Sequence, residues 1–238
     1  MGNLCVIPAR GGSKRIPRKN IKDFLGKPII AYSIEAALKS GLFSVVMVST
    51  DDEEIAEIAK KYGAEVPFLR SKKNSDDYTG TGDVVYEVLN EYKKSQIEFQ
   101  ITCCIYATAP FVKHEWLLKS FSDLQNSEAD CIMPVSKFPA PIWRSFYMND
   151  NKELTRPFPK YEAYRSQDLE ETYYDTGQFY MMYTKQLDKL KNKNVFGLKR
   201  IGLEVLGHEQ CDIDNPEDWN IAEHKFKLLS GLDSNCDK

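Results

Sequence analysis

The stretch VIPARGGSKRIPRKN, residues 6–20, concentrates side chains that could bind phosphate. It runs from an apolar segment into a loop with two adjacent glycines, two prolines and five cations, Arg10, Lys14, Arg15, Arg18 and Lys19. Glycine lets backbone N–H groups come close to phosphate oxygens, and Arg10 and Lys14 could add charge-assisted hydrogen bonds. The alternative is a flexible solvated loop, but the glycines and prolines are typical of a specified turn. The sequence therefore predicts a polyphosphate site, although its spacing matches neither a dinucleotide fingerprint nor a Walker loop.

The segment CDIDNPEDW, residues 211–219, places two carboxylates two positions apart. If residues 211–214 end a strand, Asp212 and Asp214 lie on one face and converge at its carboxyl end. Two carboxylates so close repel each other unless a cation lies between them, and proteins hold Mg²⁺ beside a substrate phosphate in this way. A second role for Asp214, as a cap of the following helix, is compatible with metal binding. The spacing predicts a Mg²⁺ site.

Two further polar segments, residues 69–83 and 164–180, contain side chains that could contact a ligand. In the first, Arg70 lies among hydroxyl and amide groups that suit a base or ribose edge and equally suit a turn. The second, taken alone, is a polar loop leading into a strand. The three histidines lack metal-ligand spacing and Ser13 is not in a G-x-S-x-G elbow, so nothing indicates a covalent intermediate.

Strand-like and helix-like segments alternate along the chain. Continuously apolar runs at residues 4–8, 45–49, 65–68, 100–106 and 131–135 are typical of strands buried on both faces of a parallel sheet. Helical periodicity occurs at residues 28–39, 53–62, 84–92 and about 114–124, and Asn215-Pro216-Glu217 marks the start of a last helix. The pattern predicts an α/β fold, Rossmann-like and doubly wound, with a mostly parallel sheet. The basic loop would lie at its carboxyl edge, where ligands bind.

Residues 138–183 interrupt this alternation. They are rich in proline and aromatic side chains, contain a turn at residues 149–151 and have no helical period. We therefore expect one domain, residues 1–238, with an inserted hairpin or lobe at about 138–183 that packs on a partner subunit as a dimerisation lobe.

The composition excludes several classes of function. A net charge of -3 gives no global attraction to nucleic acid or anionic lipid, and no apolar run approaches the roughly 20 residues of a membrane span. The N-terminus lacks the order of a signal peptide, and the six cysteines lack C-x-x-C spacing and resemble reduced, buried thiols. We expect a cytoplasmic protein with no nucleic-acid and no membrane partner.

Three motifs, IPARGGSKRIPRKN, VSTDDEEIAEIAKKYGAEVPFLR and DIDNPEDW, together resemble the CMP-sialic acid synthetase family, the cytidylyltransferases that activate nine-carbon acidic sugars. The resemblance runs through nearly the whole chain. It implies a nucleotidyltransferase that uses CTP with Mg²⁺ and forms a CMP-sugar and pyrophosphate. The segments GKPIIAYSIEAALKSGLF, IYATAPF and SQDLEETYYDTGQFY are most similar to the branch of the family that acts on pseudaminic acid.

The resemblance also implies roles for individual residues. Arg10, Lys14 and Asp214 are expected to be catalytic, and Asp212 and Asp214 to bind the metal. The expected nucleotide-binding residues are Ala9, Arg10, Gly11, Gly12, Ser13, Lys14, Lys19, Asn20, Arg70, Ser75 and Asp76. The expected sugar-binding residues are Tyr106, Thr108, Arg165, Gln167 and Gln178. Apart from the resemblance, the sugar carboxylate needs a cationic partner, and our candidate is Arg165, reaching in from the lobe of a second subunit.

Departures from the family pattern bear on the sugar. Tyr106 occupies a position where enzymes for N-acetylneuraminate typically have glutamine, and Tyr174 one where the pseudaminic branch is expected to have histidine. The Lys19-Asn20 pair differs from the Lys-Pro of the 3-deoxy-manno-octulosonate enzymes. N-acetylneuraminate, legionaminate and 3-deoxy-manno-octulosonate remain open as substrates. A sugar 1-phosphate nucleotidylyltransferase and a nucleotide-sensing module without chemistry are two further hypotheses for the function.

Overall fold

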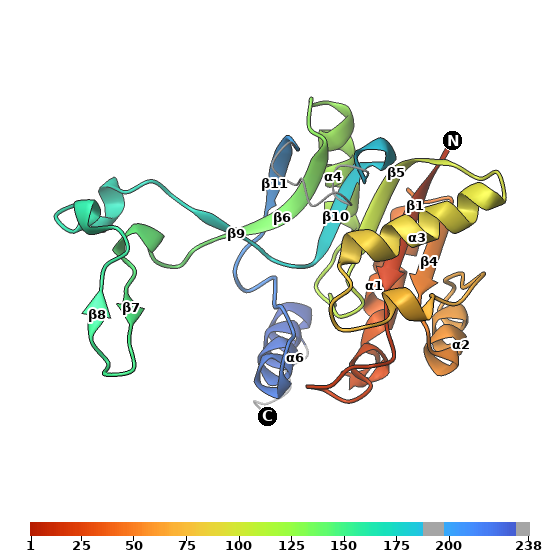
Figure 1. Cartoon of the computed structure of the whole chain (residues 1–238), viewed down its shortest axis with the longest axis horizontal. Helices are drawn as coiled ribbons and strands as arrows, with labels where there is room; N and C mark the ends of the chain where they lie inside the picture. Colours follow the sequence, from red (N-terminus) through yellow and green to blue (C-terminus); the bar gives the residue numbers. More distant parts are fainter. Residues whose placement is uncertain (188–197, 232–238) are drawn as a thin grey trace.

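The fold is built on a seven-stranded sheet, seen in a computed structural model that describes residues 1–187 and 198–231 (Figure 1). The strand order is β11-β6-β10-β5-β1-β4, and β9 also pairs with β6. The strands are β1 (Gly2–Pro8), β4 (Val45–Ser49), β5 (Phe99–Ile105), β6 (Cys131–Lys137), β9 (Tyr173–Asp175), β10 (Phe179–Tyr183) and β11 (Arg200–Glu204). Strands β4, β1 and β5 are parallel, β11 is parallel to β6, and β10 is antiparallel to both of its neighbours.

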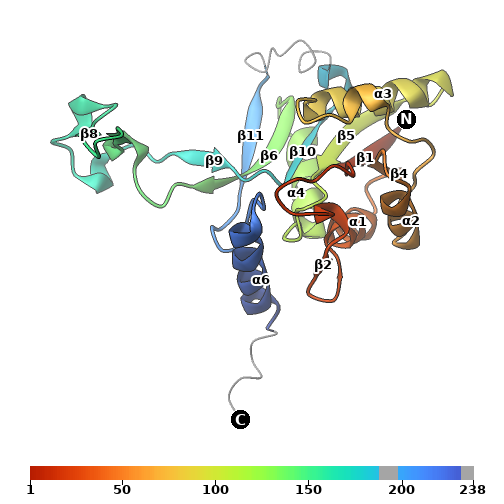
Figure 2. The same ribbon diagram turned by 60° about the horizontal axis from the view of Figure 1, so that its bottom comes forward.

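Helices cover both faces of this sheet, as predicted for a doubly wound fold. The α-helices are α1 (Ile29–Ser40), α2 (Glu53–Lys61), α3 (Thr81–Lys94), α4 (His114–Gln125) and α6 (Pro216–Ser230). Figure 2 shows α3 on the opposite side of the sheet from α1 and α4. The short 3-10 helices are η1 (Lys19–Ile21), η2 (Lys72–Asn74), η3 (Ile142–Arg144), η4 (Pro159–Tyr161), η5 (Ser166–Asp168) and η6 (Thr184–Gln186).

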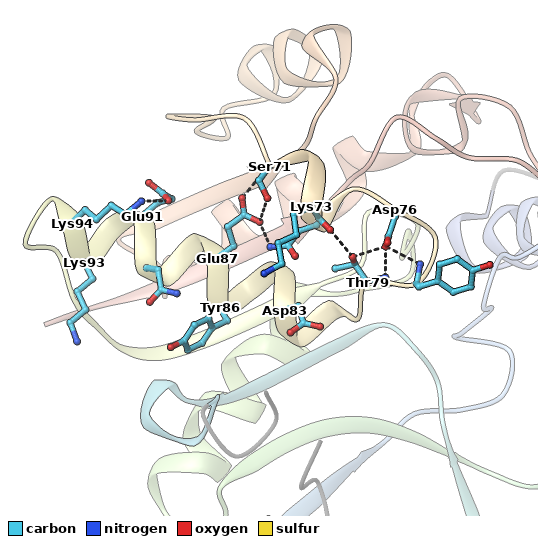
Figure 3. Close-up of a pocket in the computed structure, with 13 residues that line it drawn as sticks. Ser71, Lys73, Asp76, Thr79, Asp83, Tyr86, Glu87, Glu91, Lys93 and Lys94 are labelled. Atoms are coloured by element: carbon cyan, nitrogen blue, oxygen red, sulfur yellow. Dashed lines mark hydrogen bonds and ion pairs between the residues drawn. The ribbon is translucent and has the colours of Figure 1, made fainter. Parts of the chain in front are cut away.

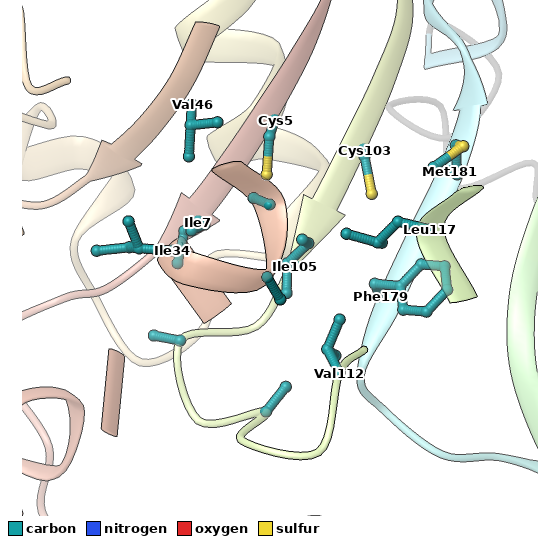
Figure 4. Close-up of a cluster of buried hydrophobic side chains, with 14 of the residues drawn as sticks. Cys5, Ile7, Ile34, Val46, Cys103, Ile105, Val112, Leu117, Phe179 and Met181 are labelled. Carbon is teal, nitrogen blue, oxygen red and sulfur yellow. The ribbon is translucent and has the colours of Figure 1, made fainter. Parts of the chain in front are cut away.

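The core explains why the strands have continuously apolar sequences. In β1, Cys5 and Ile7 pack with Ile34 of α1 and Leu117 of α4 (Figure 4), whereas Leu4 and Val6 belong to a second cluster with Val85 and Val88 of α3. Successive side chains of a strand point to opposite faces, so both sets are buried. Each buried aliphatic side chain stabilises the fold by about 1.5–3 kcal/mol relative to an exposed one.

One predicted strand is wrong. Residues 65–68 make a single bridge, Glu65 to Met47, in place of a strand. Their apolar positions are few, and Pro67 interrupts the run because proline cannot donate to a ladder. Among the described residues the sheet therefore ends at β4 on this side, where Glu65 adds backbone hydrogen bonds to Val46 and Val48.

The predicted lobe leaves the sheet after β6 and returns at β9. Its hairpin consists of β7 (Tyr147–Met148) and β8 (Leu154–Thr155), and Figure 1 shows it projecting away from the sheet at the left. The prediction extended the lobe to residue 183, but β9 and β10 belong to the central sheet, so the projecting part comprises residues 138–172. It exposes several large apolar side chains, Phe146, Tyr147, Met148, Leu154 and Tyr164.

The remaining short elements and the cysteines complete the fold. A two-stranded sheet, β2 (Asp23–Phe24) and β3 (Lys27–Pro28), precedes α1. Cys5, Cys103, Cys104 and Cys131 are free and buried in strands, as predicted, and Cys211 is free and partly buried; Cys236 lies outside the described residues. None of the helices that the structure describes combines the length and apolar character that crossing a bilayer requires.

Candidate functional site

The basic loop lies at the carboxyl edge of the sheet, where it is fixed by backbone and side-chain contacts. Ala9 is buried and donates its N–H to the carbonyl of Ser49 at 2.9 Å, and the Gly11 N–H donates to Asp51 Oδ1 at 2.9 Å. The buried Asn20 amide donates to the Arg10 carbonyl at 2.9 Å. A Cβ on Gly11 would lie 2.8 Å from Asp52 Oδ2 and would displace that carboxylate, whereas a Cβ on Gly12 would meet open space.

One of the five cations fixes the loop instead of facing a ligand. Arg18 has a left-handed backbone with φ of 55° and donates to Asp52 Oδ1 at 3.0 Å, and it also pairs with Glu54. Asp52 is the N-cap residue of α2 and accepts from the Ile55 N–H at 3.0 Å. The Arg18 guanidinium holds the pKa of the Asp52 carboxyl below its ordinary value, assisted by these backbone hydrogen bonds. Arg18 therefore ties the loop to the start of α2.

The loop borders a polar cavity of about 380 Å³. Of the residues predicted to form the site, Arg10, Ser13, Lys14, Lys19, Asn20, Arg70, Tyr106, Thr108, Asp212 and Asp214 line it. Sequence reasoning missed Arg15, Thr79 and Thr81, which also line it. Thr79 and Thr81 lie in the polar segment of residues 69–83, whose composition suits either ligand binding or a turn. No feature of the sequence distinguishes these two threonines from the other polar residues of the segment.

The two aspartates reach the cavity from an extended loop. The condition that residues 211–214 end a strand is not met, because β11 ends at Glu204 and a turn intervenes. Buried and cavity-facing side chains nevertheless alternate, as they would in a strand. Ile213 is fully buried in a cluster with Ile16, Phe24 and Trp219. Asp212 and Asp214, on either side of Ile213, line the cavity. The same cluster contains Ile16 of the basic loop, so it ties the two halves of the site together.

The surroundings of the two aspartates differ. Burial raises the pKa of the Asp212 carboxyl, and the nearby negative charge of Asp214 raises it further. Asp214 accepts from Arg15 at 2.8 Å. The alternative role of Asp214 as a helix cap is wrong, because Asn215 caps α6 in a capping box with Asp218. The Asp214 carboxylate is therefore not used by the helix start and remains directed to the basic loop.

Lys19 links the basic loop to the aspartate segment. Its Nζ donates to the Ile213 carbonyl at 2.7 Å and lies 3.9 Å from Asp214 Oδ1. Burial lowers the pKa of the Lys19 ammonium, and the charges of Asp214 and Asp212 oppose this. Because Lys19 also lines the cavity, its ammonium could form a charge-assisted hydrogen bond with a bound anion.

The polar segment of residues 69–83 reaches the cavity only in part. Arg70 is buried and donates through Nε to Ser49 Oγ at 3.0 Å, and burial lowers the pKa of its guanidinium. Ser75 Oγ donates to the Ser71 carbonyl at 2.8 Å, and Asp76 Oδ1 accepts from the Thr79 N–H at 2.7 Å. The side chains of Ser75 and Asp76 do not line the cavity. In this structure they form the turn that the composition allowed as an alternative.

Glu87 of α3 holds this segment from behind. Its carboxylate accepts from the Ser71 N–H at 2.8 Å, from Ser71 Oγ at 3.1 Å and from the Asn74 amide (Figure 3). These contacts lie on an open groove of about 940 Å³ along the outer side of α3, which includes Asp76 and Thr79. The carboxylate thus fixes η2 against α3, although no feature of the sequence singles out Glu87.

A second, more apolar cavity of about 290 Å³ shares Thr81 and Tyr106 with the first. Tyr106 Oη lies 3.1 Å from Thr81 Oγ1, and its ring packs edge-on against Tyr180 with a centroid distance of 5.9 Å. Tyr180 Oη donates to Asp175 Oδ2 at 2.6 Å, and burial together with this carboxylate raises the pKa of the phenol. Tyr106 therefore forms the wall between a polar and an apolar cavity.

Of the other residues predicted to bind the sugar, Thr108 lines the polar cavity, whereas Gln178, Arg165 and Gln167 lie apart from the walls of both cavities. The Gln178 side chain is buried outside both linings, and the residue acts through its carbonyl, which accepts from the Tyr106 N–H at 2.9 Å. Arg165 and Gln167 belong to the lobe, where Arg165 donates to Asp168 at 2.7 Å and its side chain is 71% exposed. A single chain does not bring Arg165 or Gln167 to either cavity.

Comparisons with known proteins place this geometry in a family. A sequence model of the family described as Cytidylyltransferase matches residues 4–211. The chain is 42% identical to a pseudaminic acid cytidylyltransferase of Campylobacter jejuni over 228 residues, covering 96% of this chain and 97% of the relative. It is 34% identical to a CMP-N,N'-diacetyllegionaminic acid synthase of Legionella pneumophila, covering 94% of this chain and 96% of that one.

Solved structures agree on the fold. A CMP:2-keto-3-deoxy-manno-octonic acid synthetase complexed with CTP superimposes with a TM-score of 0.72 at 18% identity, covering 98% of this chain and 100% of that one. The match of the family model from residue 4 to residue 211 spans both the basic loop and the strands that position it. The chain belongs to the cytidylyltransferase family, as its motifs predicted.

Proposed function

We propose that this protein transfers a cytidylyl group from CTP to pseudaminic acid, a nine-carbon acidic sugar, and releases pyrophosphate. The observation that carries the proposal is that the basic loop and the carboxylates of Asp212 and Asp214 line one cavity. A triphosphate needs cations around its phosphates, and nucleotidyl transfer needs charge neutralisation at the phosphate under attack. The identity to the Campylobacter relative, over nearly the full length of both chains, supports the choice of sugar.

The reaction is an in-line displacement at the α-phosphate of CTP. The anomeric hydroxyl of the sugar forms the new O–P bond and loses its proton, while the bond to pyrophosphate breaks. Arg10 and Lys14, which both line the cavity, hold the phosphates that depart, and Lys19 lies beside Asp214. Such a reaction needs alignment and charge stabilisation and no covalent intermediate, which agrees with the residues in the cavity.

The two aspartates fit Mg²⁺. They are hard oxygen donors in one cavity, and the pKa of Asp212 is raised by burial and by the charge of Asp214, a repulsion that a cation between them would relieve. When bound, the ion would neutralise charge at the α-phosphate and lower the pKa of the attacking hydroxyl. Releasing Asp214 for this role requires that Arg15, which now donates to it, turns toward the phosphates.

The apolar cavity beyond Tyr106 is the proposed place for the sugar. Cys104, Cys131, Met133 and Met182 supply its apolar wall, and Asp175 and Tyr180 supply polar groups beside it. Tyr106 would separate the nucleotide from the sugar substituents, because it lines both cavities. An apolar wall with a few polar groups suits a sugar that carries acyl and methyl groups.

The decisive experiment measures pyrophosphate release with CTP and Mg²⁺ while pseudaminic, legionaminic, N-acetylneuraminic and 3-deoxy-manno-octulosonic acids are offered in parallel. We expect turnover to be fastest with pseudaminic acid and to stop when EDTA removes the metal. Turnover with another acid alone would contradict the choice of sugar while retaining the reaction. CTP binding without turnover on any acid would favour a nucleotide-sensing module.

The lobe is proposed to make a homodimer in which each subunit completes the site of the other. It exposes Phe146, Tyr147, Met148 and Leu154 on the hairpin, and several exposed large apolar side chains on one short element are typical of an interface. Arg165 lies on the same projecting part, outside the cavities of its own chain.

The cytoplasm is the proposed location, because free buried cysteines suit a reducing compartment.

If each subunit supplies Arg165 to the site of the other, two impaired variants with substitutions in different parts of the site should complement each other in a mixed dimer. Arg165→Ala should raise the KM for the sugar at least about tenfold and leave the KM for CTP unchanged, because it removes the cation that meets the sugar carboxylate. At a sugar concentration well below the wild-type KM, mixing subunits of Arg165→Ala and Asp214→Asn should restore about a quarter of the wild-type activity, since half of the random dimers carry one intact site of their two. An additive, unrestored activity in the mixture, measured after dimer exchange, would contradict a site shared between subunits.

A further inference from the structure

Two cations of the basic loop are joined to a carboxylate outside the cavity lining. Arg10 Nη1 lies 2.5 Å from Asp77 Oδ1, and Lys14 Nζ pairs with Asp77 Oδ2. Arg10 Nη1 also donates to the Asp76 carbonyl at 2.9 Å. The two oxygens of a single carboxylate thus bind the two side chains that the proposed reaction directs at the departing phosphates.

The geometry is that of a phosphate substitute. Two oxygens on one atom, each facing one cation, reproduce how two oxygens of a phosphate group would be bound by the same pair. Hydrogen bonds from Lys14 and Arg10 lower the pKa of the Asp77 carboxyl, so it carries its negative charge at neutral pH. A triphosphate and Asp77 therefore compete for the same donors.

The surroundings allow Asp77 to leave. The segment is anchored at its base by Glu87, which holds Ser71 and Asn74 (Figure 3), and η2 contains no buried residue. Beyond this anchor the side chain of Asp77 is 35% exposed and that of its neighbour Tyr78 is 95% exposed. Rotation of this one exposed side chain would release Lys14 and would leave Arg10 only its hydrogen bond to the Asp76 carbonyl, without unpacking the core or the anchor.

We propose that Asp77 is a built-in competitor of the nucleotide: it holds Arg10 and Lys14 in the nucleotide-free protein, gives way to the triphosphate and returns as pyrophosphate leaves. The proposal rests on the proposed function, because it takes the two cations as phosphate ligands. Molecules in which Asp77 holds the two cations must release them before the nucleotide binds. The apparent affinity is therefore the intrinsic affinity multiplied by the fraction of molecules in which the cations are free. Asp77 would thus set the affinity for CTP and assist release of the charged product.

The test measures equilibrium binding by calorimetry on the full chain, with CTP, pyrophosphate and CMP as separate ligands and without sugar. Asp77→Asn should lower the Kd for CTP and for pyrophosphate about 3- to 10-fold, because the competing charge is removed. The Kd for CMP should not change, since CMP lacks the phosphates that Arg10 and Lys14 would hold. Asp77→Ser, which also removes the carboxylate, should give the same shifts.

Asp83→Asn is the matched control. Asp83 is an exposed acid in the first turn of α3, so its substitution removes the same charge nearby, and it has no hydrogen bond or ion pair with Arg10 or Lys14 among the contacts of the described residues. Its Kd values should stay at the wild-type level. Weaker CTP binding by Asp77→Asn would overturn the proposal and show that Asp77 orients the two cations for binding. Unchanged CTP binding would also overturn it and show that the ion pairs of Asp77 are surface contacts with no effect on the nucleotide. Failure of the wild type to bind CTP would instead contradict the proposed function.

Discussion

Replacing Asp214 with asparagine is expected to lower kcat by at least about 100-fold, because it removes a charged oxygen ligand beside the phosphate under attack. The fold should not change. Asn215 and Asp218 form the capping box of α6, and the Asp214 side chain is 48% exposed with Arg15 as its partner. The measurement is initial-rate kinetics at saturating CTP and sugar over a series of Mg²⁺ concentrations, together with the thermal midpoint of unfolding.

A matched control for this variant is Glu217→Gln. Glu217 is an exposed acid in the first turn of the same helix, and it does not line the cavity. It should retain nearly the wild-type rate. If Asp214→Asn also retained that rate at every Mg²⁺ concentration, the assignment of the metal to the aspartate pair would be wrong.

Replacing Lys14 with alanine is expected to lower kcat/KM for CTP by about 10- to 100-fold, because it removes a positive charge from the departing phosphates. The Lys14 side chain is 79% exposed and pairs only with Asp77 among the ion pairs of residues 1–187 and 198–231. The free energy of unfolding should therefore stay within about 0.5 kcal/mol of the wild-type value. Steady-state kinetics and chemical denaturation on the same preparation check both expectations.

Lys72→Ala serves as the control for lost charge. Lys72 is an exposed lysine in η2 that lies outside the cavity lining, so its kinetics should match those of the wild type. A large loss of stability in Lys14→Ala with unchanged kinetics would show that the basic loop is structural and that the phosphate assignment is mistaken.

The fold was predictable because its signals are local. Cys5 and Ile7 face one layer and Leu4 and Val6 the other, so burial on both faces appears in the sequence as an unbroken apolar run. Residues 65–68 also have a strand-like sequence, but in the folded chain they form one bridge and no strand, which the local sequence does not indicate. The boundary of the lobe was missed for a related reason: β9 and β10 follow a polar, aromatic stretch without a change in composition that marks their return to the sheet.

The site was predictable as a set of segments, and its internal contacts were not. The basic loop and the aspartate pair are recognisable by residue type and spacing. That Arg18 is occupied by Asp52, or that Ile213 packs with Ile16 to bring the segments together, depends on neighbours far apart in the chain. The same holds for Asp77 and Glu87, which no pattern separates from ordinary surface acids. The proposed role of Arg165 needs a second subunit, so it follows from neither the sequence nor the single chain.

The place of β10 determines the order in which this chain can complete its fold during synthesis. β10 joins the half-sheet of β4, β1 and β5 to the half-sheet of β6 and β11, and among the described strands the two halves share no other pairing. Until residue 183 has left the ribosome, β5 has an open edge whose backbone groups lack partners. The lobe must be synthesised in that interval, so a nascent chain passes through a stage with an unpaired strand and an exposed hairpin. This stage is where association between unfinished chains would begin, and where a chaperone would be of most use.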